Sequence, residues 1–253
     1  MLNKKEILTS GKIFNPAAKI YANADRVLDY LDNKNPAPVL VEIDPSNTCN
    51  HGCYFCISSY IHLPESKDLE TYDKTVMPRD VLLGACKDFV DMGVRAINWT
   101  GGGEPTINKH LREAITYIGE NSDIKMGIFT NGTLLDRWDL FETMVDNMTW
   151  VRFSIDAGTP ETYNNIRRAK GNRGWDKMVE NLNTLIKVNK DRGKKIGIGV
   201  GFVITPDTCH EIVDFAKYFA ELDVDYCQYK PEIVNRERED GVQRDLEFWQ
   251  KNV

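Results

Sequence analysis

Short β-branched apolar runs alternate with longer segments of helical periodicity along most of the chain. Six runs predict strands: Val39–Ile43, Ala96–Thr100, Lys125–Thr130, Trp150–Asp156, Ile196–Ile204 and Tyr226–Lys230. Between consecutive runs, apolar residues recur every three or four positions, as in Leu111, Ile115 and Ile118, which is typical of a helix with one buried face. Because a helix follows each strand, we expect a parallel sheet with helices covering its outer face.

Six such units predict the α/β fold class and, within it, a partial (β/α)6 TIM-like barrel, in which chemistry gathers at the carboxyl ends of the strands. Residues Ala17–Asn33 also have helical spacing, and the prolines at 36 and 38 end that helix. We therefore expect an N-terminal helical arm over residues 1–37, the barrel core over 38–234 and a charged C-terminal helix over 235–253. The last segment leaves open either a natural terminus or the start of a missing extension.

The overall composition excludes several classes of protein. The chain has 253 residues, of which 42% are hydrophobic, so it has enough apolar material for a core. Its net charge of −6 gives no general electrostatic reason to expect a nucleic-acid partner. No run approaches the roughly 20 apolar residues that span a bilayer, and the first ten residues lack the apolar run of a secretory signal. We expect a cytoplasmic protein that makes no membrane contact.

Three of the six cysteines, Cys49, Cys53 and Cys56, lie within eight positions just after the first predicted strand. Their spacing lets three thiolates converge from one loop on a single centre. On a four-iron cluster, three ligands leave one iron without a protein ligand, which is the open position that a reactive metal centre needs. The alternative is a zinc site completed by His51 or another histidine, although the remaining cysteines are isolated.

The Cys-x-x-x-Cys-x-x-Cys pattern, with an aromatic residue before its last cysteine, resembles that of the radical S-adenosyl-L-methionine (SAM) enzymes. The resemblance extends over roughly Val39 to Lys230. It implies that the three cysteines hold a [4Fe-4S] cluster and that SAM chelates the unique iron. It also implies that Phe55 lies beside the adenine of SAM, with a plain packing role as the alternative.

Two further strand ends carry residues of this resemblance. Glycines at 101–103 permit the backbone to approach a ligand closely, and the carboxylate of Glu104 can accept hydrogen bonds from an ammonium group. Gly102, Gly103 and Glu104 match the element that binds the methionine amino group of SAM in the family. At the end of the third strand, Thr130 and Asn131 are implied SAM contacts, but an Asn-Gly pair alone is most often a turn.

The fourth predicted strand alternates so that Arg152, Ser154 and Asp156 share one face. Polar side chains inside a barrel need partners, and these are supplied either by a buried hydrogen-bond network or by a ligand. The resemblance implies that Ser154 and Asp156 face the ribose and methionyl part of SAM, whereas Arg152 is interpreted as structural.

The candidate site is completed by three residues that lie further along the chain: Arg167, Val203 and Cys227. Thr159 and Pro160 predict a helix start, and the Tyr-x-x-Ile-Arg stretch that follows resembles one that offers an arginine, here Arg167, to the SAM carboxylate. The alternative is a solvated arginine. Val203, on the glycine-rich fifth strand, matches a residue that touches adenine. Cys227, on the sixth strand, is either a hydrogen-atom donor to a substrate radical or a small apolar residue of the core.

The function implied by the resemblance is reductive cleavage of SAM to methionine and a 5′-deoxyadenosyl radical, which abstracts hydrogen from a substrate. That substrate is a peptide, a sugar or another small molecule, and the electron comes from a one-electron donor such as flavodoxin or ferredoxin. Two other hypotheses remain open at this point. One is a non-catalytic iron–sulfur or zinc barrel that binds a partner. The other is an RNA-modifying radical SAM enzyme, which the net acidity disfavours.

Overall fold

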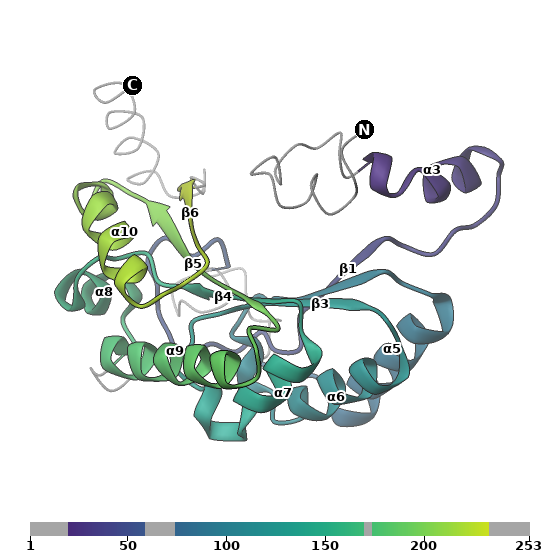
Figure 1. Cartoon of the computed structure of the whole chain (residues 1–253), viewed down its shortest axis with the longest axis horizontal. Helices are drawn as coiled ribbons and strands as arrows, with labels where there is room; N and C mark the ends of the chain where they lie inside the picture. The colour runs from purple at the N-terminus through teal and green to yellow at the C-terminus, as the bar shows by residue number, and fades with distance from the viewer. Residues whose placement is uncertain (1–19, 59–73, 170–173, 233–253) are drawn as a thin grey trace.

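Six parallel strands form one sheet whose spatial order follows their order in the chain (Figure 1). The computed structural model describes residues 20–58, 74–169 and 174–232. Its strands are β1 (Leu40–Ile43), β2 (Ala96–Trp99), β3 (Lys125–Thr130), β4 (Trp150–Ser154), β5 (Gly197–Ile204) and β6 (Tyr226–Pro231). Because every crossover steps in the same direction, the helices all fall on one side of the sheet. This confirms the predicted α/β class and partial barrel.

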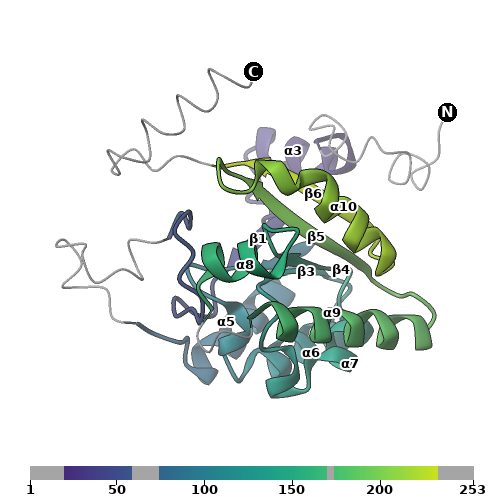
Figure 2. The same ribbon diagram turned by 90° about the vertical axis from the view of Figure 1, so that its left-hand side faces the viewer.

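The helices pack against the outer face of the sheet. They are α5 (Arg79–Met92), α6 (Leu111–Asn121), α7 (Leu140–Asn147), α8 (Pro160–Arg167), α9 (Gly174–Asp191) and α10 (Ile212–Glu221). In Figure 1, α5, α6, α7 and α9 lie below the sheet and α8 and α10 at its left. Figure 2 shows the same layers from the side. The core lies between these two layers. Alternate residues of each strand point into it, so that Ile97, Ile128 and Val151 are fully buried.

The end of β4 departs from the prediction, which carried the strand to Asp156. The strand ends at Ser154, and the amides of Ile155 and Asp156 both donate to the carbonyl oxygen of Gly201, at 3.1 Å each. Asp156 itself takes a left-handed conformation with φ of 67°, which regular strand pairing does not allow. The chain therefore turns inward at the mouth of the barrel, and this turn aims the Asp156 carboxylate at the site.

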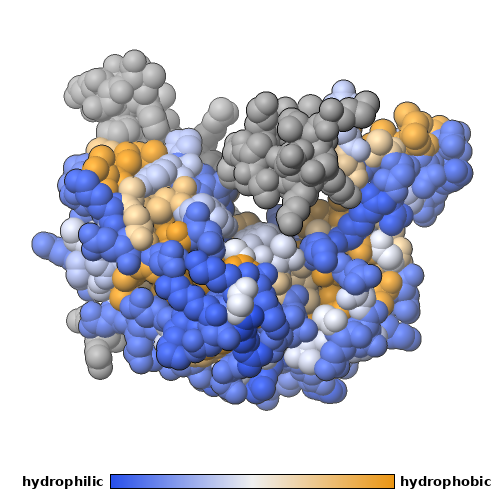
Figure 3. All heavy atoms as spheres, in the orientation of Figure 1, coloured by the Kyte–Doolittle hydropathy of each residue, from blue (hydrophilic) through white to orange (hydrophobic). Residues whose placement is uncertain are grey.

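The N-terminal arm contains α3 (Ala24–Leu31), which lies within the helix predicted over Ala17–Asn33. Residues 20–22 are also helical and a turn at Asn23 separates them from α3. Asp25 forms an ion pair with Arg95, and Arg26 donates to the Gly93 carbonyl at 2.9 Å, so the arm is tied to the start of β2. No residue of α3 is buried, and its apolar side chains give the orange patch at the upper right of Figure 3. Residues 1–19 and the C-terminal helix predicted over 235–253 lie outside the described residues. In the described ranges, no helix has the length and apolarity needed to cross a membrane.

Candidate active site

The cysteine motif lies on the loop that follows β1, at the carboxyl end of the sheet. Cys49, Cys53 and Cys56 are free, partly buried thiols. The Gly52 amide donates to the Arg167 carbonyl oxygen at 3.0 Å, and the Cys53 thiol lies 3.8 Å from the same oxygen. The loop is therefore attached to the end of α8, more than a hundred residues further along the chain.

Burial keeps the thiols of Cys49 and Cys53 protonated when no metal is bound. It raises the pKa of Cys49 to about 12, with a further contribution from the charge of Glu104, and it raises the pKa of Cys53 to about 11. Thiolates are the metal ligands, so binding a positively charged metal centre would release these protons.

The donor set fits an iron–sulfur cluster better than a single zinc ion. Three thiols come from one loop, and the described residues contain no group of three His, Cys, Asp or Glu side chains that would hold one metal ion. His51, the candidate fourth zinc ligand, lies between Cys49 and Cys53 in the sequence. It is buried, and its Nε2 faces Thr133 Oγ1 at 3.5 Å. A tetrahedral zinc site needs four ligands close together, whereas a larger cluster accepts three sulfurs that are further apart.

The glycine-rich loop after β2 packs directly on the cysteine loop. The Gly103 amide donates to the Ser46 carbonyl oxygen at 3.1 Å, and the Glu104 amide donates to the Thr48 carbonyl oxygen at 2.9 Å. A Cβ atom at Gly103 would lie only 2.2 Å from that Thr48 oxygen. A side chain there would push the two loops apart, so glycine at this position is a requirement of the close backbone approach.

The Glu104 carboxylate joins this pair of loops to the end of β3. It is buried, and its Oε1 accepts from the Thr106 amide at 3.2 Å and from the hydroxyls of Thr106 and Thr130 at 2.6 Å each. Its Oε2 accepts from the Asn131 amide at 2.7 Å. An ionised carboxylate oxygen accepts more than one hydrogen bond, so Oε2 keeps capacity for an ammonium donor.

Thr130 and Asn131 lie in a support behind the cysteines. Asn131 Nδ2 donates to Asn50 Oδ1 at 2.8 Å, and Asn50 Nδ2 donates to Thr133 Oγ1 at 2.8 Å. Gly132, between Asn131 and Thr133, has φ of 76°. The Asn-Gly pair therefore also forms a turn, as the alternative interpretation predicted. The contacts of Asn50 and Thr133 could not be predicted from the sequence, because only the fold brings these loops together.

A buried ion pair between Asp156 and Arg167 forms the other side of the site. Arg167 Nη1 donates to Asp156 Oδ2 at 2.7 Å, and Nη2 donates to the Ser154 carbonyl oxygen. Asp156 Oδ1 accepts from the Val203 amide at 2.8 Å. Burial alone would lower the pKa of Arg167, but the charges of Cys53 and Asp156 outweigh it and raise that pKa. Both terminal nitrogens of Arg167 are thus bound to protein, and its buried Nε has no partner among the described residues.

A cavity of about 300 Å³ opens between the cysteine loop and strands β4 to β6. Six residues predicted for the site line it: Phe55, Cys56, Ser154, Asp156, Arg167 and Val203. Gly102, Gly103, Glu104, Thr130 and Asn131 lie outside that lining, on the β1–β3 side. The cavity wall also contains Arg152, Gln228 and Lys230, which the sequence analysis had not assigned to a ligand.

Cys227 does not face this cavity. Gln228 and Lys230 of β6 line it, and Cys227 lies on the opposite face of the strand together with Tyr229. Tyr229 donates to the Ile212 carbonyl oxygen of α10 at 2.8 Å, so that face packs on the helices. The thiol packs against the core, as the alternative interpretation of Cys227 predicts, and its role as a hydrogen donor stays a prediction.

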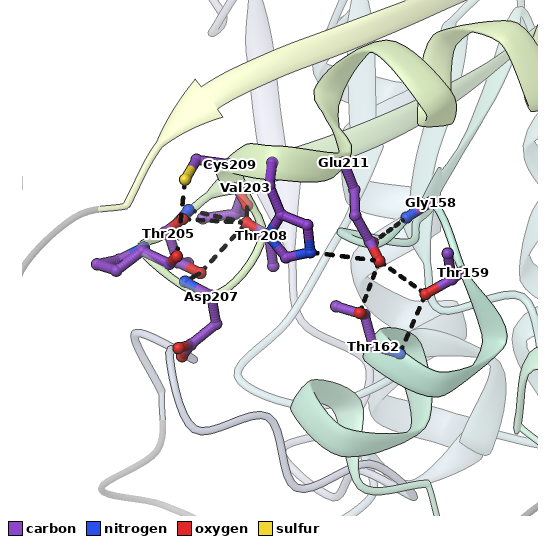
Figure 4. A network of polar contacts seen from close by, with 11 residues as sticks. Gly158, Thr159, Thr162, Val203, Thr205, Asp207, Thr208, Cys209 and Glu211 are labelled. Atoms are coloured by element: carbon purple, nitrogen blue, oxygen red, sulfur yellow. Dashed lines mark hydrogen bonds and ion pairs between the residues drawn. The ribbon is translucent and has the colours of Figure 1, made fainter. Parts of the chain in front are cut away.

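A network of polar contacts around β5 and α10 holds the cavity walls in place (Figure 4). Glu211, buried, accepts from the Gly158 amide and from the hydroxyls of Thr159 and Thr162, each at 2.7 Å. Thr159 also caps α8, as predicted, by accepting from the Thr162 amide. Because α8 ends at Arg167, Glu211 fixes the helix that carries the buried cation. Its role was invisible in the sequence, since it depends on contacts across some fifty residues.

The cysteine loop has a second tether to the same network. The Tyr54 hydroxyl donates to Asp207 Oδ2 at 2.7 Å and lies at hydrogen-bond distance, 3.1 Å, from the Thr205 hydroxyl. Thr205 in turn lies 3.2 Å from the hydroxyl of Thr208, which donates to the Val203 carbonyl oxygen (Figure 4). The loop after β1 is therefore also connected to the loop after β5.

The sequence matches the family model of the radical SAM superfamily over residues 43–216. The matched region is well over half of the chain and includes the cysteine loop, the glycine-rich loop and α8. The chain therefore belongs to the radical SAM superfamily, whose enzymes use a [4Fe-4S] cluster and SAM.

Individual relatives show how far this similarity extends. The chain is 25% identical over 234 residues to molybdenum cofactor biosynthesis protein 1 of Dictyostelium discoideum, which covers 88% of this chain and 35% of that protein. It is 25% identical over 182 residues to a probable GTP 3′,8-cyclase of Sulfurisphaera tokodaii, with 71% of this chain and 51% of the relative covered. The chain thus spans about a third to a half of the length of these relatives.

Solved structures share the same fold. SuiB of Streptococcus suis bound to SAM superimposes with a TM-score of 0.62 at 16% identity, over 98% of this chain and 56% of SuiB. The structure of anSMEcpe with bound AdoMet gives a TM-score of 0.59 at 20% identity, over 85% of this chain and 61% of that one. These likenesses are evidence for the partial barrel.

Proposed function

We propose that this enzyme holds a [4Fe-4S] cluster on Cys49, Cys53 and Cys56 and cleaves SAM reductively across the strand ends. The observation that supports this most directly is the junction of the cysteine loop and the glycine-rich loop, which Gly103 alone makes possible, beside a cavity lined by Cys56. The cluster and SAM, when bound, supply a radical that abstracts hydrogen from a substrate, and the protein supplies orientation and a closed site.

Each side chain then has a defined task. Oε2 of Glu104 accepts a hydrogen bond from the ammonium group of SAM, at the junction of the two loops. Phe55 and Val203, which line the cavity together, provide apolar contact for the adenine, and Ser154 and Asp156 face the ribose and methionyl part. Arg167 places a buried positive charge next to the thiolates and lowers the cost of their ionisation.

The substrate is proposed to be a small molecule or a peptide, bound at the mouth of the cavity, with a flavodoxin- or ferredoxin-like protein as electron donor. Two of the relatives are named for molybdenum cofactor biosynthesis and for a GTP 3′,8-cyclase. We therefore place GTP first among the compounds to test.

The experiment is SAM cleavage by protein reconstituted with iron and sulfide without oxygen. Addition of SAM and dithionite should give 5′-deoxyadenosine and methionine in equal amounts. A variant with alanine at Cys49, Cys53 and Cys56 should form neither, whereas Cys86→Ala, which changes a fully buried cysteine of α5, should retain cleavage. Zinc in place of iron, or no deoxyadenosine from a cluster-loaded protein, would contradict the proposal and favour a non-catalytic binding protein.

A further inference from the structure

Two cations, Arg152 and Lys230, line the cavity without an ion-pair partner. Neither has a carboxylate within ion-pair distance among the described residues, and the cavity's only lining carboxylate, Asp156, is paired with Arg167. Arg152 donates through Nη1 to Gln228 Oε1, and its guanidinium lies 4.0 Å from the centroid of the Phe129 ring. Its Nε is buried and has no hydrogen-bond partner in the described part of the chain.

The surroundings of these two side chains carry more positive than negative charge. Burial lowers the pKa of Arg152, and the charges of Tyr226 and Asp156 oppose it only in part. Burial and then the charge of Arg152 lower the pKa of Lys230, which only the more distant Glu42 of β1 opposes. A partly buried cation such as Arg152, repelled by a second cation at the mouth of the cavity, is costly unless an anion joins them. An anion bound in the cavity would therefore lower the electrostatic cost of placing these two cations there.

The strand register places a glycine between the two cations. Gly201 of β5 pairs with Ser154 on one side and Gln228 on the other, in the row between Arg152 and Lys230, so that row has no side chain in its middle. The Arg152 side chain packs over this glycine, since a Cβ at Gly201 would be 3.5 Å from Arg152 Nε. Gln228 fixes one end of the guanidinium, and the planar fork of an arginine suits a carboxylate or a phosphate.

We propose that Arg152 and Lys230, with Arg152 oriented by Gln228, form an oxyanion-binding subsite for the substrate. This inference rests on the proposed function, because it assigns to the substrate of that reaction a carboxylate or phosphate group. Arg152 makes the charge-assisted hydrogen bonds deep in the cavity, and Lys230, which is exposed at the end of β6, attracts the anion at the mouth. Arg152, interpreted as structural from the sequence, becomes a binding residue.

The test is isothermal titration of the anaerobically reconstituted protein with inorganic pyrophosphate and, separately, with malonate, at constant ionic strength. At least one anion should bind, and the anion that binds identifies a phosphate or a carboxylate as the recognised group. Arg152→Gln should weaken that binding by about tenfold or more, because a hydrogen-bonded charge pair is lost. Lys230→Gln should weaken it less, since this side chain is exposed. Lys125→Gln, an exposed lysine at the opposite end of the sheet, is the matched control and should bind as the parent does.

The same titration with SAM distinguishes the two ligands. If neither anion binds, or if both variants bind as the parent does, the inference is wrong. If Arg152→Gln weakens SAM as much as it weakens the anion, Arg152 belongs to the SAM site and the inference is overturned. The proposed function is tested separately, because deoxyadenosine formation from SAM and dithionite in the parent protein needs no substrate.

Discussion

The two sides of the site differ in how completely their polar groups are bonded. On the β1–β3 side, the Glu104 carboxylate has four protein donors and joins the glycine-rich loop to the end of β3. On the β4–β6 side, the Nε atoms of Arg152 and Arg167 are buried and have no hydrogen-bond partner among the described residues, and the same part of the chain offers Arg152 and Lys230 no ion pair. The first side is largely bonded within the protein, with capacity left at Glu104 Oε2 for an ammonium donor, and is suited to hold the cluster loop in one shape. The second side has bonding capacity left over, as a surface for exchangeable ligands does.

Removing the charge of Asp156 should have the largest effect on stability. Asp156→Asn leaves the buried Arg167 without its anion, and the neighbouring thiols stay protonated at neutral pH without a metal. Breaking one partner of a buried pair costs about 3–5 kcal/mol. We expect that loss in the free energy of unfolding of cluster-free protein, measured in urea. Asp146→Asn, which removes a surface partner of Lys195, should cost less than about 1 kcal/mol. Equal effects would mean that burial does not distinguish the two pairs.

A methyl group at Gly103 should disrupt the β1–β3 side. Gly103→Ala places Cβ against the Thr48 carbonyl oxygen, and such overpacking costs about 1–3 kcal/mol. We expect reduced iron incorporation as well, since the cysteine loop must shift. Gly84→Ala on α5 is the control: its Cβ meets nothing within 4 Å, so it should stabilise the protein by about 0.5–1 kcal/mol. Full cluster loading by Gly103→Ala would show that the two loops need not touch.

The Glu211 network predicts a pH dependence of stability. Burial by itself raises the pKa of Glu211, but hydrogen bonds from Thr159, Thr162 and the Gly158 amide outweigh it and lower that pKa below its ordinary value of 4.5. A carboxyl whose pKa is lower in the folded state stabilises the fold above its unfolded value and loses this contribution as pH falls. Unfolding free energy should therefore decrease below about pH 4.5, and Glu211→Gln should flatten the decrease. An unchanged slope in that variant would contradict the assignment.

The tether through Tyr54 should have the smallest effect. Tyr54→Phe removes the hydroxyl that bonds Asp207 and lies next to the Thr205 hydroxyl. The loss of a hydrogen bond of this kind costs about 1 kcal/mol in the free energy of unfolding. Tyr30→Phe, at a side chain that is 72% exposed, should leave the free energy of unfolding unchanged. If the two variants unfold alike in urea, the Tyr54 hydroxyl adds nothing to the attachment of the cysteine loop to the loop after β5.

Much of the fold was predictable because its signals are local. Alternating apolar residues identified all six strands to within two residues, and three- and four-residue spacing located the helices behind them. Residues 150–156 show the limit of such a pattern: the alternation continues to Asp156, but the Gly201 carbonyl captures two successive amides and ends the strand early. Nothing in the local sequence shows that competing acceptor.

The sequence by itself determined the order of the elements, the three-cysteine motif and the residue types at each strand end, because spacing along a chain is enough to set them. Only the tertiary structure decided which of those residues meet. Glu104 and Asn131 make hydrogen bonds that support the cysteine loop. Cys227 lies on the face of β6 that packs against the helices, and Arg152 and Lys230 line the same cavity. Contacts between residues far apart in the chain depend on strand register and on the curvature of the sheet, and no local pattern encodes either one.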